Sequence, residues 1–265
     1  MAELVAMGAH RRTTFAIVGG VLSAALLAGC AIAGAAFLYV RHVHAAAAAT
    51  GGRVTETSRL SADRGAVVFA DDFHDPTSGW NAATLPSGTS FGYALGGYVV
   101  TGKGTLHHFA EAPFQDALSQ LSMAVTATQT ANAPPGAGFG VTCWRGDGDA
   151  RVRYEFVVLA PGTWYLERDG GVATLSSRGV VLDKGTAHAG PGASPITIVG
   201  MCVSIDSVST RLALFVNGKK MVDRVDRSAG ASDLGWLSGL DVSSRDAGDS
   251  SVMVTRFEVR DLTHS

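Results

Sequence analysis

The chain has 265 residues, of which 46% are hydrophobic and 17% are charged, and its formal net charge at pH 7 is −2. A chain so close to neutrality lacks the basic surface that nucleic-acid binding requires, and it offers no general attraction to an acidic partner. After the N-terminal segments described next, about 200 residues remain, which is enough for one domain with a buried core.

An uncharged, apolar run occupies residues 15–40. A run of this length can cross a bilayer whose hydrocarbon core is about 30 Å thick. Arg11 and Arg12 precede the run directly and favour a cytoplasmic N-terminus, although Arg41 on the other side partly offsets them. We therefore expect a short cytoplasmic tail at residues 1–14 followed by a single transmembrane anchor.

The same run contains a possible lipoprotein signal. Leu27-Ala28-Gly29-Cys30 is the pattern of a bacterial lipobox, in which the cysteine is lipidated and becomes the mature N-terminus. A basic start followed by an apolar segment is also typical of an export signal. In this alternative the signal ends at Gly29 and Cys30 carries the lipid. Residues 31–40 remain apolar, however, and the transmembrane anchor explains the whole run. Both interpretations place the rest of the chain outside the cytoplasm, at the membrane.

Residues 41–65 are predicted to be a linker, since they begin with a run of alanines and two glycines and show no apolar periodicity. A flexible coil of about 25 residues has an end-to-end distance of roughly 25–30 Å, which would hold the following domain near the membrane. The domain itself is expected to occupy residues 66–265.

From Val67 onward the pattern is one of short strands and turns. Val152–Val158 alternates apolar and polar residues, as a strand with one face in solvent does. Arg211–Val216 is followed by Asn217-Gly218, which favours a tight hairpin turn. Further strands are predicted at Tyr98–Thr101, Leu121–Gln129, Gly138–Trp144, Trp164–Arg168, Ile196–Ile205 and Val252–Arg260. The fold is therefore predicted to be all-β, a two-sheet antiparallel sandwich or jelly roll.

Cys143 and Cys202 are the two cysteines outside the N-terminal run. An even pair in an oxidising compartment normally forms a disulfide. Neither residue has the close Cys or His neighbours that a zinc site needs. We therefore expect a bridge between them.

Several motifs resemble those of concanavalin A-like jelly-roll ectodomains, relatives of the laminin-G-like and 3-keto-disaccharide hydrolase-type domains of bacterial surfaces. The motifs appear in the family's order at Val68–Trp80, Tyr93–Val99, Gly138–Arg145, Met201–Val203 and Leu212–Gly218. The resemblance spans roughly residues 68–262 and implies a jelly-roll sandwich with a bridge between the same two cysteines. Thr255-Arg256-Phe257 departs from the Asp-Asn-Phe-like segment usual in the family, which puts a polar site at that end in doubt.

No motif predicts catalytic residues. Glycosidases of this fold carry a Glu-x-Asp-x-x-Glu strand, which can place two carboxylates about 5 Å apart, and this spacing is absent. Glu155, Glu167 and Glu258 stand alone on their strands and are expected to face solvent. Whether the domain is an enzyme stays open, and the absence of a motif favours a role without catalysis.

Asp71, Asp72 and Asp75 form the densest group of potential oxygen ligands in the chain. Calcium takes six to eight oxygen ligands, so a structural calcium ion is the one cofactor that the sequence suggests. Asp-Pro and Ser-Gly pairs are also turn formers, and we favour the simpler interpretation that this segment is a turn.

Trp164 and Tyr165 are the predicted ligand-binding residues, because sugars stack their apolar faces on aromatic rings. Adjacent strand residues face opposite sides, so one of the two is expected to face outward. Trp80 and Trp144 are assigned to the core.

The sequence thus predicts a membrane-anchored, extracytoplasmic β-sandwich that binds a glycan or another cell-envelope component without catalysis. Two alternatives stay open. One is a hydrolase acting on a sugar derivative, and the other is a structural or assembly partner of another membrane protein.

Overall fold

The structure is a computed structural model that describes residues 59–102, 106–114, 116–130, 133–146, 151–170, 179–192, 194–228, 234–244 and 249–263. The predicted tail, the run at residues 15–40 with Cys30, and most of the predicted linker lie outside these residues. Within the described ranges, no helix is both long and apolar enough to span a membrane.

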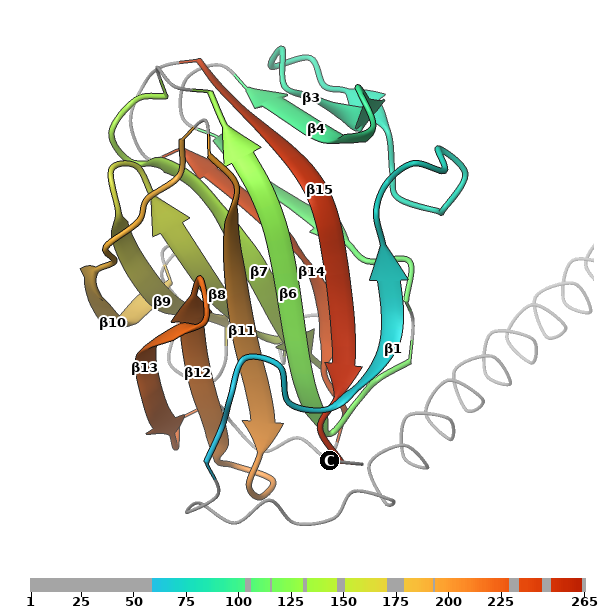
Figure 1. Ribbon diagram of the computed structural model, residues 1–265. Helices are drawn as coiled ribbons and strands as arrows, with labels where there is room; N and C mark the ends of the chain where they lie inside the picture. Colours follow the sequence, from blue (N-terminus) through green and yellow to red (C-terminus); the bar gives the residue numbers. More distant parts are fainter. Residues whose placement is uncertain are drawn as a thin grey trace, which may run out of the picture. The chain divides into compact units, whose positions relative to one another are not determined.

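Two antiparallel sheets pack face to face (Figure 1). The larger sheet contains β1 (Ala66–Asp71), β2 (Ala83–Thr84), β3 (Ser90–Ala94), β4 (Gly97–Gly102), β6 (Gln120–Gln129), β11 (Ile196–Ser204), β12 (Thr210–Val216), β13 (Lys219–Asp226) and β15 (Ser250–Asp261). The smaller sheet contains β5 (Leu106–Glu111), β7 (Ala137–Arg145), β8 (Val152–Leu159), β9 (Thr163–Gly170), β10 (Val180–Thr186) and β14 (Leu237–Ser244). The expected all-β, two-sheet sandwich is confirmed.

The strand order of the nine-stranded sheet is β13-β12-β11-β6-β15-β4-β3-β2, and β1 pairs with the second half of β15. The strand order of the six-stranded sheet is β10-β9-β8-β7-β14-β5. The hairpin predicted around Asn217-Gly218 is the one that joins β12 to β13, and both turn residues have positive φ angles. Neighbouring strands in space are therefore often distant in the sequence.

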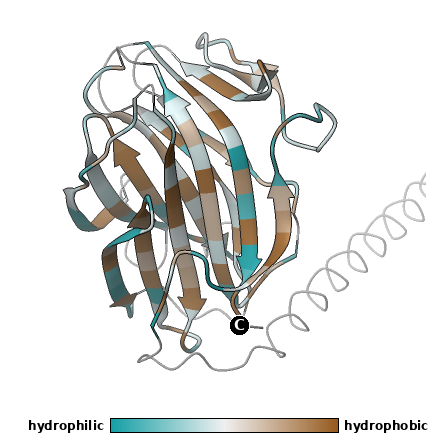
Figure 2. Ribbon diagram, viewed as in Figure 1, coloured by the Kyte–Doolittle hydropathy of each residue, from teal (hydrophilic) through white to brown (hydrophobic). Residues whose placement is uncertain are grey.

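The core fills the space between the sheets, because alternate residues of each strand face it. On β8, for example, Tyr154, Phe156 and Val158 belong to the buried cluster between the sheets, and the residues between them point away. Figure 2 shows the corresponding alternation of apolar and polar residues along β6 and β15. Burial of these apolar surfaces is the main stabilising term of such a sandwich.

Cys143 on β7 and Cys202 on β11 form the expected disulfide, with their Cα atoms 6.7 Å apart. The bridge joins the two sheets, since β7 belongs to the smaller and β11 to the larger. Gly200 marks the same close approach. A Cβ atom there would lie 2.7 Å from side-chain atoms of Phe156 and Val141, which is too near for any larger residue.

Residues 59–65 run across the outer face of the nine-stranded sheet before β1 begins (Figure 1). Leu60 is buried there in a second apolar cluster that includes Val199, Met201 and Phe215. These strand residues would otherwise present an apolar patch to water. The C-terminal end of the segment predicted as a linker is thus packed on the sheet.

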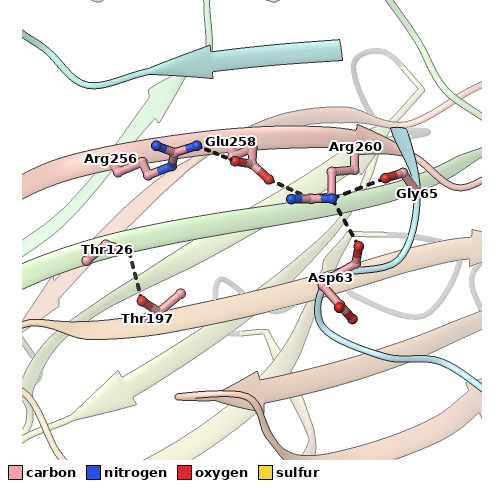
Figure 3. Close-up of polar contacts among 7 residues, drawn as sticks. All are labelled: Asp63, Gly65, Thr126, Thr197, Arg256, Glu258 and Arg260. Atoms are coloured by element: carbon pink, nitrogen blue, oxygen red, sulfur yellow. Dashed lines mark hydrogen bonds and ion pairs between the residues drawn. The ribbon is translucent and has the colours of Figure 1, made fainter. Parts of the chain in front are cut away.

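An ion-pair row on β15 fixes this segment in place (Figure 3). Arg256 and Arg260 contact the carboxylate of Glu258 at 2.8 and 2.5 Å. Burial opposes ionisation of Glu258, but the two guanidinium groups outweigh it and lower the pKa of the carboxyl group. Arg260 also donates hydrogen bonds to the carbonyl oxygens of Asp63 (3.0 Å) and Gly65 (3.1 Å).

A buried charge network links β9 to the end of β13. The carboxylate of Asp226 lies 2.9 Å from the guanidinium of Arg168 and accepts hydrogen bonds from the hydroxyl of Tyr154 (2.9 Å) and the N–H of Ser228 (3.0 Å). Burial opposes ionisation of Asp226, but these partners outweigh it and lower the pKa of the carboxyl group. The network therefore holds a charged carboxylate inside the sandwich.

Removing the disulfide should destabilise the domain. For a loop of 59 residues, the chain-entropy relation gives a loss in the free energy of unfolding on the order of 4 kcal/mol. The double variant Cys143→Ala/Cys202→Ala is expected to show this loss in urea denaturation, and reduction of the wild type should reproduce it. An unchanged midpoint in both would contradict a stabilising role for the bridge.

Asp226→Asn should lower the free energy of unfolding at neutral pH by about 3 kcal/mol, because Arg168 stays buried without its partner. The folded-state pKa of Asp226 is lowered, so its contribution is fully present above the ordinary aspartate value of 3.8 and is lost as the pH falls below it. Denaturation curves of the two proteins should therefore converge on acidification. Asp183→Asn, at a more exposed carboxylate, is the control, and parallel pH profiles for wild type and Asp226→Asn would refute this account.

Candidate functional site

The outer face of the six-stranded sheet carries an unusual set of side chains, and we call it the six-stranded face. It consists of the strand residues whose side chains point away from the core, and these residues lie opposite one another on neighbouring strands. Its main members are Phe109 and Glu111 on β5, Gly239, Asp241 and Ser243 on β14, Gly140, Thr142 and Trp144 on β7, Arg153, Glu155 and Val157 on β8, Tyr165, Glu167 and Asp169 on β9, and Lys184 on β10.

One part of the six-stranded face is a stack of aromatic and charged groups. The rings of Phe109 and Trp144 meet edge to face, with centroids 4.8 Å apart. The guanidinium of Arg153 lies 5.5 Å from the centroid of Phe109, a cation–π arrangement. Arg153 also pairs with Glu155 at 2.9 Å and with Asp169 at 2.8 Å. Glu155 is only 3% exposed, although it points away from the core.

A hydrogen-bonded chain crosses the other part of this face. The hydroxyl of Tyr165 donates to Ser243 Oγ (3.3 Å), and Ser243 Oγ donates to Asp241 Oδ1 (3.1 Å). Tyr165 on β9 reaches β14 over two intervening strands, and Gly138 and Gly140 on β7 present no side chain in its way. Asp241 is 1% exposed, so a second carboxylate is held in buried surroundings.

Thr142 lies at the centre of this surface, paired with Glu155 on one side and Gly239 on the other. Its side chain is 0% exposed, and its hydroxyl oxygen has no hydrogen-bond partner among the described residues. Leaving a buried hydroxyl unsatisfied costs about 1–3 kcal/mol, and native proteins rarely accept it without a reason. A polar group of a bound molecule would satisfy this oxygen.

The structure separates the predicted pair Trp164 and Tyr165. As expected, they face opposite sides of β9, but neither is exposed, at 6% and 4%. Trp164 belongs to the core between the sheets, packed against Gly185, and does not reach the six-stranded face. Tyr165 does lie on this face, where its hydroxyl is hydrogen-bonded. One of the two thus faces away from the core, as expected, although its side chain is buried, and ligand binding by either residue stays a prediction.

Two other tryptophans were assigned to the core by the sequence. Trp80 is indeed part of the cluster between the sheets. Trp144 is buried too, but it lies on the six-stranded face, where it packs on Phe109. Trp144 is therefore buried as expected, but on the outer side of the sheet, where it adds an aromatic residue to the candidate site.

Glu155 and Glu167, which the sequence analysis treats as isolated, are direct partners across the β8-β9 hairpin. The position of the turn at Pro161-Gly162 fixes the register of the two strands, and this register predicts the pair. Counting outward from this turn, Leu159 pairs with Thr163, and every second step along both strands then reaches Glu155 and Glu167. Glu258, by contrast, lies on the other sheet.

The three predicted metal ligands are engaged in turns. Asp71 is buried, and its carboxylate accepts hydrogen bonds from the N–H of Phe73 (2.7 Å), the hydroxyl of Ser78 (2.5 Å) and the indole of Trp80 (2.9 Å). It therefore ties the end of β1 to the loop that follows.

Asp72 accepts a hydrogen bond from the N–H of His74 (3.2 Å), and Asp75 accepts one from the N–H of Thr77 (2.8 Å). The hydrogen bonds from the hydroxyl and N–H of Thr77 lower the pKa of Asp75. Within the described ranges, no group of three or more His, Cys, Asp or Glu residues is placed to hold a metal ion. The calcium site stays a prediction without support from the described geometry.

No family model matches the chain, and neither does any curated protein. Solved structures with a similar fold include the GH43 BlXynB protein from Bacillus licheniformis, with a TM-score of 0.50 and 13% identity over 72% of this chain and 39% of that one.

Others are the carbohydrate binding module CBM66 from Bacillus subtilis (TM-score 0.44, 15% identity, 68% of this chain and 95% of that one) and the potassium-bound carbohydrate recognition domain of Emp46p (TM-score 0.46, 10% identity, 69% and 88%). At these identities the likeness concerns the fold alone, a two-sheet antiparallel β-sandwich.

Asp71→Ala should destabilise the domain whether or not calcium is present, because three donors, two of them buried, lose their acceptor. We expect a loss of about 2–3 kcal/mol in the free energy of unfolding. Asp72→Ala and Asp75→Ala, at exposed carboxylates, serve as controls with small losses. If calcium stabilises the wild type and any of these variants abolishes that effect, the segment is a metal site after all.

Proposed function

We propose that this chain is a glycan-binding module outside the cytoplasm, held at a membrane by its N-terminal segment, and that the six-stranded face binds the glycan. One observation carries the proposal. This surface lies outside the core, yet it gathers aromatic rings, hydroxyl groups and charged groups in buried surroundings. Glu and Asp residues are almost never fully buried unless they are paired, so the arrangement is costly and calls for a functional reason.

The chemistry of this face suits a sugar. Sugar rings present apolar C–H faces, which pack on aromatic side chains such as Phe109 and Trp144. Their hydroxyl groups both donate and accept hydrogen bonds. Asp241 and Glu155 would accept such bonds, and the hydroxyl oxygen of Thr142 would gain the partner it lacks. A few polar groups placed beside apolar ones are typical of small-molecule sites.

The proposed location depends on the disulfide and on the N-terminal run. A buried bridge between Cys143 and Cys202 indicates an oxidising compartment, as found outside the cytoplasm. Residues 15–40 supply enough apolar length for the anchor, either as a transmembrane helix or as a lipoprotein signal that ends at Gly29. The module would then present its binding surface to the cell envelope.

The hydrolase alternative has one specific observation in its favour. Glu155 and Glu167 are direct cross-strand partners, so their side chains start from Cβ atoms about 5 Å apart and their carboxyl groups can come within a similar distance of each other. Retaining glycosidases use two carboxyl groups about 5–5.5 Å apart. Binding experiments should therefore also measure whether the glycan is cleaved. Cleavage by the wild type that is lost in Glu155→Gln would identify the protein as an enzyme.

Glycan binding should weaken when the six-stranded face is changed with little loss of packing. We expect Trp144→Phe and Tyr165→Phe each to raise the Kd by about tenfold, which corresponds to about 1.4 kcal/mol. Calorimetric titration of the full-length chain in detergent, against neutral, basic and acidic oligosaccharides, measures this effect.

Arg256→Gln, on the exposed surface of the opposite sheet, is the matched control and should bind as the wild type does. Circular dichroism establishes that each variant is folded. Binding that survives both aromatic substitutions would place the site elsewhere. Failure of every glycan to bind would favour the third possibility, a partner protein in the membrane.

A further inference from the structure

The six-stranded face is strongly acidic, although the chain as a whole is almost neutral. Among its described residues, five carboxylates face two cations. The carboxylates are Glu111, Glu155, Glu167, Asp169 and Asp241, and the cations are Arg153 and Lys184. A surface with this excess of negative charge repels acidic ligands and attracts basic ones.

Arg153 is already engaged by two of these carboxylates. Proteins commonly bind an acidic sugar through a guanidinium group that grips its carboxylate with two hydrogen bonds. The guanidinium of Arg153 is instead held between Glu155 and Asp169 at 2.9 and 2.8 Å, and it stacks over Phe109. The remaining cation, Lys184, lies on the edge strand β10, away from the aromatic stack on β5 and β7. Among the described residues, the centre of the face therefore offers acceptors and no cation outside the pairs of Arg153.

Thr142 provides an independent indication that the centre of the face binds a hydrogen-bond donor. Its hydroxyl is fully buried beside Glu155, and its oxygen has no hydrogen-bond partner among the described residues. A protonated amine has three N–H donors. It could donate to this oxygen and to a neighbouring carboxylate together, whereas a single sugar hydroxyl has only one O–H donor.

We propose that the glycan recognised by the six-stranded face is one whose sugars carry free amino groups, such as oligomers of glucosamine. The inference rests on the proposed function and makes it more specific. The aromatic stack of Phe109 and Trp144 would pack against the sugar ring, and the carboxylates would pair with the ammonium groups. Polymers of uronic acids are excluded by the same charges.

The test compares three oligosaccharides of equal length against the full-length chain in detergent, at a pH where the amines are protonated. They are a glucosamine oligomer, its N-acetylated counterpart and an alginate oligomer. We expect the glucosamine oligomer to bind at least about tenfold more tightly than the N-acetylated one, and its affinity to fall with added salt. The alginate oligomer should not bind.

Two charge-neutralising variants locate the effect. Glu155→Gln at the buried centre and Glu111→Gln at the exposed edge should each reduce the preference for the glucosamine oligomer, and the second keeps the test valid if the first misfolds. Glu258→Gln, on the opposite sheet, is the control and should keep the preference.

Equal or tighter binding of the N-acetylated or alginate oligomer would overturn the inference while leaving glycan binding intact. The same preference in both Glu155→Gln and Glu111→Gln would also overturn it. Failure of all three oligosaccharides to bind would overturn the inference together with the proposed function.

Discussion

The disulfide between Cys143 and Cys202 sets the relation between the two sheets, and the surface on the far side of β7 depends on it. Because Cys143 must face β11 across the core, its neighbours Thr142 and Trp144 must point the other way. The polar and aromatic groups of the six-stranded face are thus a geometric consequence of a core bridge. The close approach of the sheets at Gly200 strengthens the same constraint, since no larger residue would fit between them.

Much of the fold could be predicted from the sequence, because its signals are local. The alternation in Val152–Val158 and the turn at Asn217-Gly218 each predict a strand or hairpin that the structure contains. The bridge follows from counting cysteines and from the compartment. The opening motif is less decisive, since Asp71 could be a turn residue, the interpretation favoured from the sequence, or a metal ligand. The three hydrogen bonds that its carboxylate accepts show that, among the described residues, Asp71 stabilises a turn.

The candidate site could not be predicted as well, because it depends on register between strands that are distant in the chain. Phe109 and Trp144 meet although β6 separates their strands in sequence and β14 lies between them in the sheet. Alternation shows that Trp164 and Tyr165 face opposite ways, but not which one enters the core. The orientation of Trp144 could have been predicted, since its neighbour Cys143 forms the bridge and has to face inward, so that Trp144 has to face outward. The pairing of Glu155 with Arg153 depends on side-chain conformation, which no spacing in the sequence encodes.

The segment at residues 59–65 has a mechanical consequence. It lies across the strands of the nine-stranded sheet and is fastened by Leu60 and by two hydrogen bonds from Arg260. Tension on the N-terminal side of the chain would therefore peel this segment from the sheet one contact at a time before any strand is strained. Contacts that open one after another yield at lower force than strands sheared all at once. Release of this segment would lengthen the chain between the point of pulling and β1 while the sandwich and its six-stranded face stay folded.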